Sequence, residues 1–111
     1  MIFKPFVTFF LATTLSIACS LSFAETVWID VRSAVEYKLD HIDGDIRISH
    51  GDIVGEVSTL YPAKDTAIHL YCRSGGRAGK ALTALTEAGY TNVSNVGSIQ
   101  NARKERGISK P

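Results

Sequence analysis

The fold of this chain follows from residues 68–79, which read IHLYCRSGGRAG. The apolar residues 67–71 predict a buried strand, and the alanine- and leucine-rich residues 77–88 predict a helix. Cys72 therefore stands between a strand end and a helix N-terminus, where unpaired N–H groups and the helix dipole favour negative charge. We expect its thiol to ionise more readily than that of a free cysteine, whose pKa is about 8.5.

Residues 72–77, here called the cysteine loop, have the composition of an anion site. The two glycines let successive backbone N–H groups turn inward, and Arg77 places a planar guanidinium at the helix start. A lone cysteine at a strand end is often only a small buried hydrophobe. The glycines and arginines together favour a nucleophilic thiolate at Cys72 instead. The predicted binding set is Arg73, Ser74, Gly75, Gly76, Arg77 and Ala78.

Strand and helix patterns alternate along residues 27–105. Strands are predicted at 27–31, 46–48, 67–71 and 93–96, and helices at 33–37, 52–60, 77–88 and 99–105. Ser33 and Glu36 form a capping-box pattern, and Gly89 is expected to end the third helix. This alternation predicts an α/β fold with a mainly parallel sheet covered by helices on both faces. Sites in such folds lie at the carboxyl ends of strands, where Cys72 is placed.

The first 24 residues have the pattern of a secretory signal peptide. Lys4 precedes an apolar run over residues 6–18, and small residues allow cleavage after Ala24. The run is shorter than the roughly 20 residues of a membrane span, although an uncleaved anchor and lipidation of Cys19 remain alternatives. We expect residues 25–111 to form one exported, periplasmic domain without a membrane span.

Composition argues against several classes of protein. Beyond residue 24, basic and acidic residues are equal in number. Arg103, Lys104, Arg106 and Lys110 gather at the tail, where we expect a solvated end, not a nucleic-acid surface. Cleavage would leave Cys72 as the only thiol, which excludes a CxxC oxidoreductase and an intramolecular disulfide. No zinc-type Cys/His spacing is present, and no metal or cofactor is expected.

The cysteine loop resembles the active-site loop of rhodanese-type sulfurtransferases. Four residues separate Cys72 from Arg77, whereas the protein tyrosine phosphatase signature has five. The segments 29–32 (IDVR), 41–44 (HIDG) and 89–93 (GYTNV) are similar to other motifs of the family. In size and layout the chain resembles small periplasmic thiosulfate sulfurtransferases of the phage-shock type. It departs from the family pattern at Asp40, where glycine is common, and at Asp45, where a small residue is common.

The resemblance implies a two-step reaction without a cofactor. Cys72 would take the sulfane sulfur of thiosulfate as a persulfide and pass it to cyanide or a thiol. Arg73 would bind the donor's sulfonate oxygens, and Arg77 would brace the loop or lower the thiol pKa. Asp30 and Arg32 would support the loop, or form a purely structural ion pair. We expect a monomer; a persulfide carrier and, less favoured, phosphatase or arsenate-reductase chemistry are the alternatives.

Overall fold

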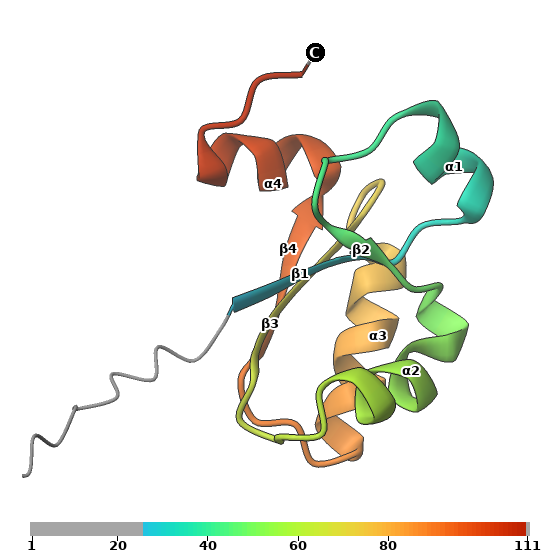
Figure 1. Cartoon of the computed structure of the whole chain (residues 1–111), viewed down its shortest axis with the longest axis vertical. Coiled ribbons are helices and arrows are strands. Elements are labelled where there is room, and N and C mark those ends of the chain that lie inside the picture. The colour runs from blue at the N-terminus through green and yellow to red at the C-terminus, as the bar shows by residue number, and fades with distance from the viewer. Residues whose placement is uncertain (1–25, 111) are drawn as a thin grey trace, which may run out of the picture.

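Parallel strand pairing organises the described part of the chain. The computed structural model describes residues 26–110, and Figure 1 shows their strands packed among helices. The strands are β1 (Thr26–Asp30), β2 (Ile46–Arg47), β3 (Ala67–Cys72) and β4 (Val93–Ser98). All neighbours pair in parallel, in the order β2-β1-β3-β4. The carboxyl ends of the strands therefore meet at one edge of the sheet.

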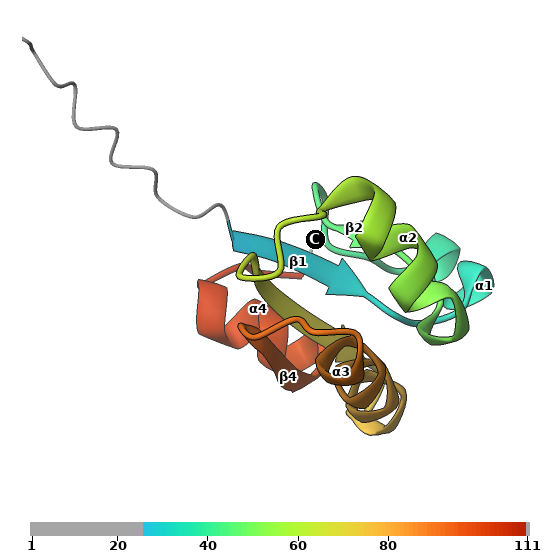
Figure 2. The same cartoon turned by 90° about the horizontal axis from the view of Figure 1, so that it is seen from below.

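Within residues 26–110, helices cover both faces of this sheet. They are α1 (Ala34–Leu39), α2 (Ile53–Leu60), α3 (Gly76–Glu87) and α4 (Ile99–Arg106), with a 3₁₀ turn, η1 (His50–Asp52), before α2. Figures 1 and 2 show α4 on the opposite side of the strands from α2 and α3. The predicted α/β architecture is confirmed.

Most predicted boundaries agree with the structure, because local signals set them. The Ser33 side chain accepts the Glu36 backbone N–H, and the Glu36 carboxylate accepts the Ser33 N–H, as a capping box requires. Gly89 follows α3 with a φ of 100°. The predicted helix 52–60 differs only at its start, since Asp52 belongs to the preceding 3₁₀ turn.

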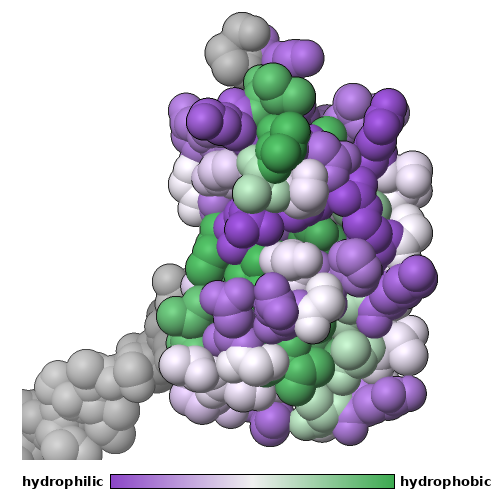
Figure 3. All heavy atoms as spheres, turned by 90° about the vertical axis from the view of Figure 1, so that its right-hand side faces the viewer, coloured by the Kyte–Doolittle hydropathy of each residue, from purple (hydrophilic) through white to green (hydrophobic). Residues whose placement is uncertain are grey.

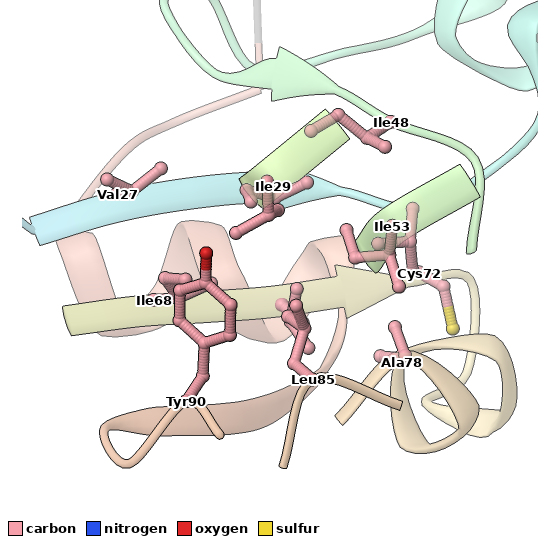
Figure 4. Close-up of a cluster of buried hydrophobic side chains, with 13 residues drawn as sticks. Val27, Ile29, Ile48, Ile53, Ile68, Cys72, Ala78, Leu85 and Tyr90 are labelled. Atoms are coloured by element: carbon pink, nitrogen blue, oxygen red, sulfur yellow. The ribbon is translucent and has the colours of Figure 1, made fainter. Parts of the chain in front are cut away.

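The larger core lies between the sheet and the helices α2 and α3 (Figure 4). Because successive residues of a strand point to opposite faces, alternate residues of β1 and β3 enter this core. They are Val27, Ile29, Ile68, Leu70 and Cys72. Leu85 of α3 and Ile53 of α2 pack against them. Cys72 is thus the last residue of β3 that faces this core, and this position explains why its side chain is buried.

A smaller core joins the other face of the sheet to α4. Tyr71 packs there with Ile42, Ile99 and Ala102. The Tyr71 hydroxyl donates to Asp45 Oδ2 at 2.6 Å. Burial and this carboxylate raise the pKa of Tyr71, so its hydroxyl remains a donor.

The prediction of a solvated basic tail is wrong for two of its four residues. Arg103 is buried and binds Asp40 through both terminal nitrogens, at 3.1 and 2.8 Å. Arg106 binds Asp45 in the same way, at 2.7 and 3.0 Å, and lies over the Trp28 ring. Asp40 and Asp45, which precede their arginine partners by 63 and 61 residues, thus hold α4 in place.

The predicted signal peptide and Cys19 lie outside the described residues. Within residues 26–110, no helix combines the length and apolar character that a bilayer crossing requires.

Candidate active site

Cys72 ends β3, and its sulfur faces the first turn of α3 (Figure 4). The residue is 1% exposed and carries a free thiol. The backbone N–H of Gly75 donates to the Cys72 Sγ at 3.0 Å. The strand end and the helix N-terminus therefore meet at the sulfur, as the sequence predicts.

The loop backbone favours the thiolate form of Cys72. Burial raises the pKa of the thiol, but hydrogen bonds from the backbone N–H groups of Ala78, Ser74, Gly75 and Arg77 outweigh it, and the net effect lowers the pKa. Donors aimed at one sulfur stabilise its charged form. Four of the six residues predicted to bind an anion thus donate to the sulfur itself through their backbone.

The titration of Cys72 should reveal this effect. We expect the thiolate to appear at a lower pH than in a free cysteine, whose pKa is about 8.5, because the N–H donors stabilise the anion. The measurement is the ultraviolet absorbance of thiolate against pH, taken as the difference between the wild type and Cys72→Ser. Subtraction removes the contributions of tyrosine and Cys19. A midpoint at or above the free-cysteine value would contradict the loop's proposed influence.

Asn95, which the sequence analysis missed, braces the cysteine loop. Its side-chain nitrogen donates to the Gly75 carbonyl at 3.0 Å, and its side-chain oxygen accepts the Gly97 N–H at 2.9 Å. Gly75 has a φ of 102°, and a Cβ there would lie 3.4 Å from the Gly97 Cα. β4 thus holds the loop through the Asn95 side chain, and the positive φ at position 75 favours glycine.

Replacing Gly75 with alanine should destabilise the protein by about 1–3 kcal/mol, because the left-handed backbone is strained for L-residues. Gly76→Ala is the matched control: Gly76 lies in α3, and its added Cβ would meet nothing within 4 Å. We expect the control to be neutral or slightly stabilising. Chemical denaturation of both variants measures the difference, and equal free energies of unfolding would show that Gly75 has no special role.

The Arg77 side chain binds Glu36 of α1. Its terminal nitrogens donate to the two Glu36 oxygens at 2.6 and 2.9 Å. This guanidinium holds the pKa of Glu36 well below its usual range. The Arg77 backbone N–H lowers the pKa of Cys72, and the pKa of Arg77 is itself raised, first by Glu36 and also by the charge of Cys72. Bracing of the loop by the Arg77 side chain stays a prediction.

Asp30 and Arg32 form a buried pair at the end of β1. The Arg32 guanidinium binds both Asp30 oxygens, at 2.8 to 3.1 Å. The Arg32 Nη2, which donates to Asp30, also donates to the Asp40 carbonyl at 2.6 Å. Asp30 is next to Tyr71 in the β1–β3 register. The pair therefore links β1, which lies beside β3, to the segment around Asp40, and Asp40 in turn binds Arg103 of α4.

A pocket of about 310 Å³ opens beside the cysteine loop. Its lining includes Arg73, Glu36, Leu39, Ile99 and Gln100. Arg73 and Ser74 are exposed, whereas Ala78 is buried. Among residues 26–110, no three His, Cys, Asp or Glu side chains group to hold a metal.

Comparison with known proteins identifies relatives over most of the chain. The family model for the rhodanese-like domain matches residues 20–104. Thiosulfate sulfurtransferase PspE of Escherichia coli (strain K12) is 35% identical over 79 residues, covering 71% of this chain and 76% of the relative. The chloroplastic thiosulfate sulfurtransferase 16 of Arabidopsis thaliana is 28% identical over 108 residues, covering 87% and 89%.

A solved structure agrees with these relatives. A rhodanese with anions from E. coli superposes with a TM-score of 0.67 and 32% identity, covering 78% of this chain and 95% of the other.

Proposed function

Because the chain belongs to the rhodanese-like family and is a sulfurtransferase, we propose that it carries sulfane sulfur from thiosulfate to a thiophilic acceptor on Cys72. The main support is the position of the Cys72 sulfur among backbone N–H donors at the start of α3. Those donors favour the thiolate before the reaction, and they can hold the anionic persulfide that forms after sulfur transfer. Two of the related proteins are named thiosulfate sulfurtransferases.

The first step loads the enzyme. The Cys72 thiolate attacks the outer sulfur of thiosulfate, an S–S bond forms at Sγ, and the S–S bond of thiosulfate breaks. The electron pair of that bond leaves with sulfite, and Cys72 becomes a persulfide anion. This is covalent catalysis by a nucleophile with a lowered pKa. The exposed guanidinium of Arg73 is suited to bind the sulfonate oxygens.

The second step returns the enzyme to its starting state. Cyanide or a thiolate attacks the terminal sulfur of the persulfide. The persulfide S–S bond breaks, and its electron pair returns to the Cys72 sulfur. With cyanide the product is thiocyanate. Ser74, Gly75, Gly76 and Ala78 would hold the charge through their backbone, and Arg77 would keep the loop in shape through Glu36.

The test is a direct measurement of sulfur loading. We expect the protein to gain the mass of one sulfur atom with thiosulfate and to lose it with cyanide, with thiocyanate released. Many turnovers per protein molecule would identify an enzyme. Stable, stoichiometric loading with slow turnover would favour the carrier function instead. Absence of both loading and thiocyanate would refute thiosulfate as donor.

Phosphatase or arsenate-reductase chemistry fits the site less well. Only four residues separate Cys72 from Arg77, one fewer than in the protein tyrosine phosphatase signature, so the loop is small for a phosphate. Two of the five N–H donors of Arg77 are also already given to Glu36. An aryl phosphate should therefore be hydrolysed no faster than by the denatured protein.

We further propose that the protein is exported and acts in the periplasm as a monomer, with residues 25–111 as its single domain. The support is the signal-peptide pattern that ends at Ala24. N-terminal sequencing of the protein from the periplasm would distinguish cleavage after Ala24 from lipidation at Cys19.

A further inference from the structure

Glu36 of α1 and Asn95 of β4 both bind the cysteine loop, but the two elements are held in the protein very differently. α1 has no buried residues, and its Val35 and Leu39 are exposed. Figure 3 shows an apolar patch surrounded by hydrophilic residues near the top of the molecule, at the height of α1 in Figure 1. Little packing therefore fixes α1. In contrast, β4 pairs directly with β3 as far as Cys72, so the sheet itself sets the position of Asn95 relative to the sulfur.

A bulge in β4 directs the Asn95 side chain. Leu70 of β3 pairs with Asn95. The next residue of β3, Tyr71, pairs with Gly97, so β4 has one extra residue between the two pairs. Bulges of this kind redirect side chains and are frequent beside active sites. Across the bulge, Asn95 Oδ1 accepts the Gly97 N–H at 2.9 Å. With its oxygen used there, the amide presents its nitrogen to the cysteine loop.

The amide nitrogen anchors Gly75, whose own N–H reaches the sulfur. Asn95 Nδ2 donates to the Gly75 carbonyl at 3.0 Å, and the same carbonyl accepts the Gly79 N–H of α3 at 2.9 Å. On its other side, Gly75 donates its N–H to the Cys72 Sγ at 3.0 Å. A glycine has no side chain to restrict its backbone. The bonds to its carbonyl therefore determine the direction in which its N–H points.

We propose that Asn95 is a positioning residue for Cys72: it holds Gly75 so that the Gly75 N–H points at the sulfur and stabilises its negative charge. The inference rests on the proposed function, because its consequence for catalysis depends on sulfur transfer at Cys72. Asn95 is exposed, and without its side chain the Gly75 carbonyl keeps its bond to Gly79. Its removal should therefore affect the sulfur more than the stability of the fold, because a group unpaired at the surface can bind water.

Asn95→Ala in the full-length protein removes the donor without adding a charge. We expect the midpoint of the Cys72 thiolate absorbance to rise by about 0.5–1 pH unit, the size expected when one hydrogen bond to an ion is weakened. Cys72→Ser in the same background provides the difference spectrum. The pH profile of sulfur loading should shift upward together with this midpoint. The free energy of unfolding in urea should fall by less than in Gly75→Ala.

Asn95→Asp separates the two bonds of the amide. The carboxylate can still accept the Gly97 N–H, but it cannot donate to the Gly75 carbonyl and repels that oxygen. The midpoint should therefore rise at least as far as in Asn95→Ala. Asn92→Asp is the matched control, because it adds the same charge at an exposed residue just before β4. The control should leave the midpoint unchanged.

The outcomes separate the two proposals. An unchanged midpoint in Asn95→Ala would overturn the positioning role. Equal rises in Asn92→Asp and Asn95→Asp would also overturn it, because added charge alone would then explain the effect. A loss of stability in Asn95→Ala as large as in Gly75→Ala would make Asn95 a structural residue instead. A wild-type protein that takes no sulfur from thiosulfate would refute the proposed function, whereas the thiolate titration would still decide on Asn95.

Discussion

Replacing Cys72 with serine is expected to abolish sulfur loading and to lower thiocyanate formation by at least about a thousandfold. A serine hydroxyl remains protonated at neutral pH, and the backbone donors that favour a thiolate supply no base to activate it. Loss of a covalent nucleophile commonly costs several orders of magnitude in rate. The change from sulfur to oxygen leaves the side-chain volume nearly the same, so the fold should persist.

The measurement is the loaded mass together with the rate of thiocyanate release. Cys19→Ser is the matched control, because it removes the other cysteine of the sequence, and it should keep the full rate. Thermal unfolding of both variants verifies that they are folded. A Cys72→Ser variant that retained even a tenth of the wild-type rate would rule out Cys72 as the sulfur carrier.

Replacing Asp30 with alanine is expected to reduce the free energy of unfolding by about 3–5 kcal/mol. Asp30 is fully buried, and its two oxygens accept three hydrogen bonds from the Arg32 guanidinium and one from the Arg32 backbone N–H. The substitution would leave the buried Arg32 charge without its carboxylate. Such an uncompensated charge costs far more than the net stabilisation that an intact pair provides.

Urea unfolding measures this loss. Asp43→Ala is the control, since the Asp43 side chain is fully exposed, and it should change stability by less than about 0.5 kcal/mol. The double variant Asp30→Ala/Arg32→Met should recover part of the loss, because it removes both charges. The sequence left two interpretations of Asp30 and Arg32: support of the cysteine loop, or a purely structural ion pair. Reduced specific activity of folded Asp30→Ala would indicate support of the loop. Unchanged specific activity would indicate a structural pair.

The features predicted from the sequence are those that depend on interactions between residues close together in the chain. The cysteine loop is a continuous segment whose glycines and adjoining helix define its shape, so its backbone donors could be anticipated at Cys72. The capping box needs only Ser33 and Glu36, one turn apart. Alternation of strands and helices determined the parallel sheet, and with it the position of Cys72 at a strand end.

The features that were missed depend on contacts between distant parts of the chain. Asn95 reaches Gly75 across 20 residues, and Arg103 and Arg106 reach Asp40 and Asp45 across 63 and 61. An arginine in a polar tail has the same local pattern whether it is solvated or buried. The two unusual aspartates were a usable signal, because a carboxylate in place of a small residue requires a partner when it is buried.

The ion pairs of α4 restrict how this protein can diverge. A descendant that lost Asp45 alone would carry Arg106 and the Tyr71 hydroxyl without their acceptor. One that lost Arg103 alone would leave Asp40 with only Lys110, at 4.0 Å. Replacing both partners together is much cheaper than replacing one. Positions 40 and 103, and likewise 45 and 106, should therefore change as couples among its descendants. A homologue with glycine at the first position of such a couple should lack the arginine at the second.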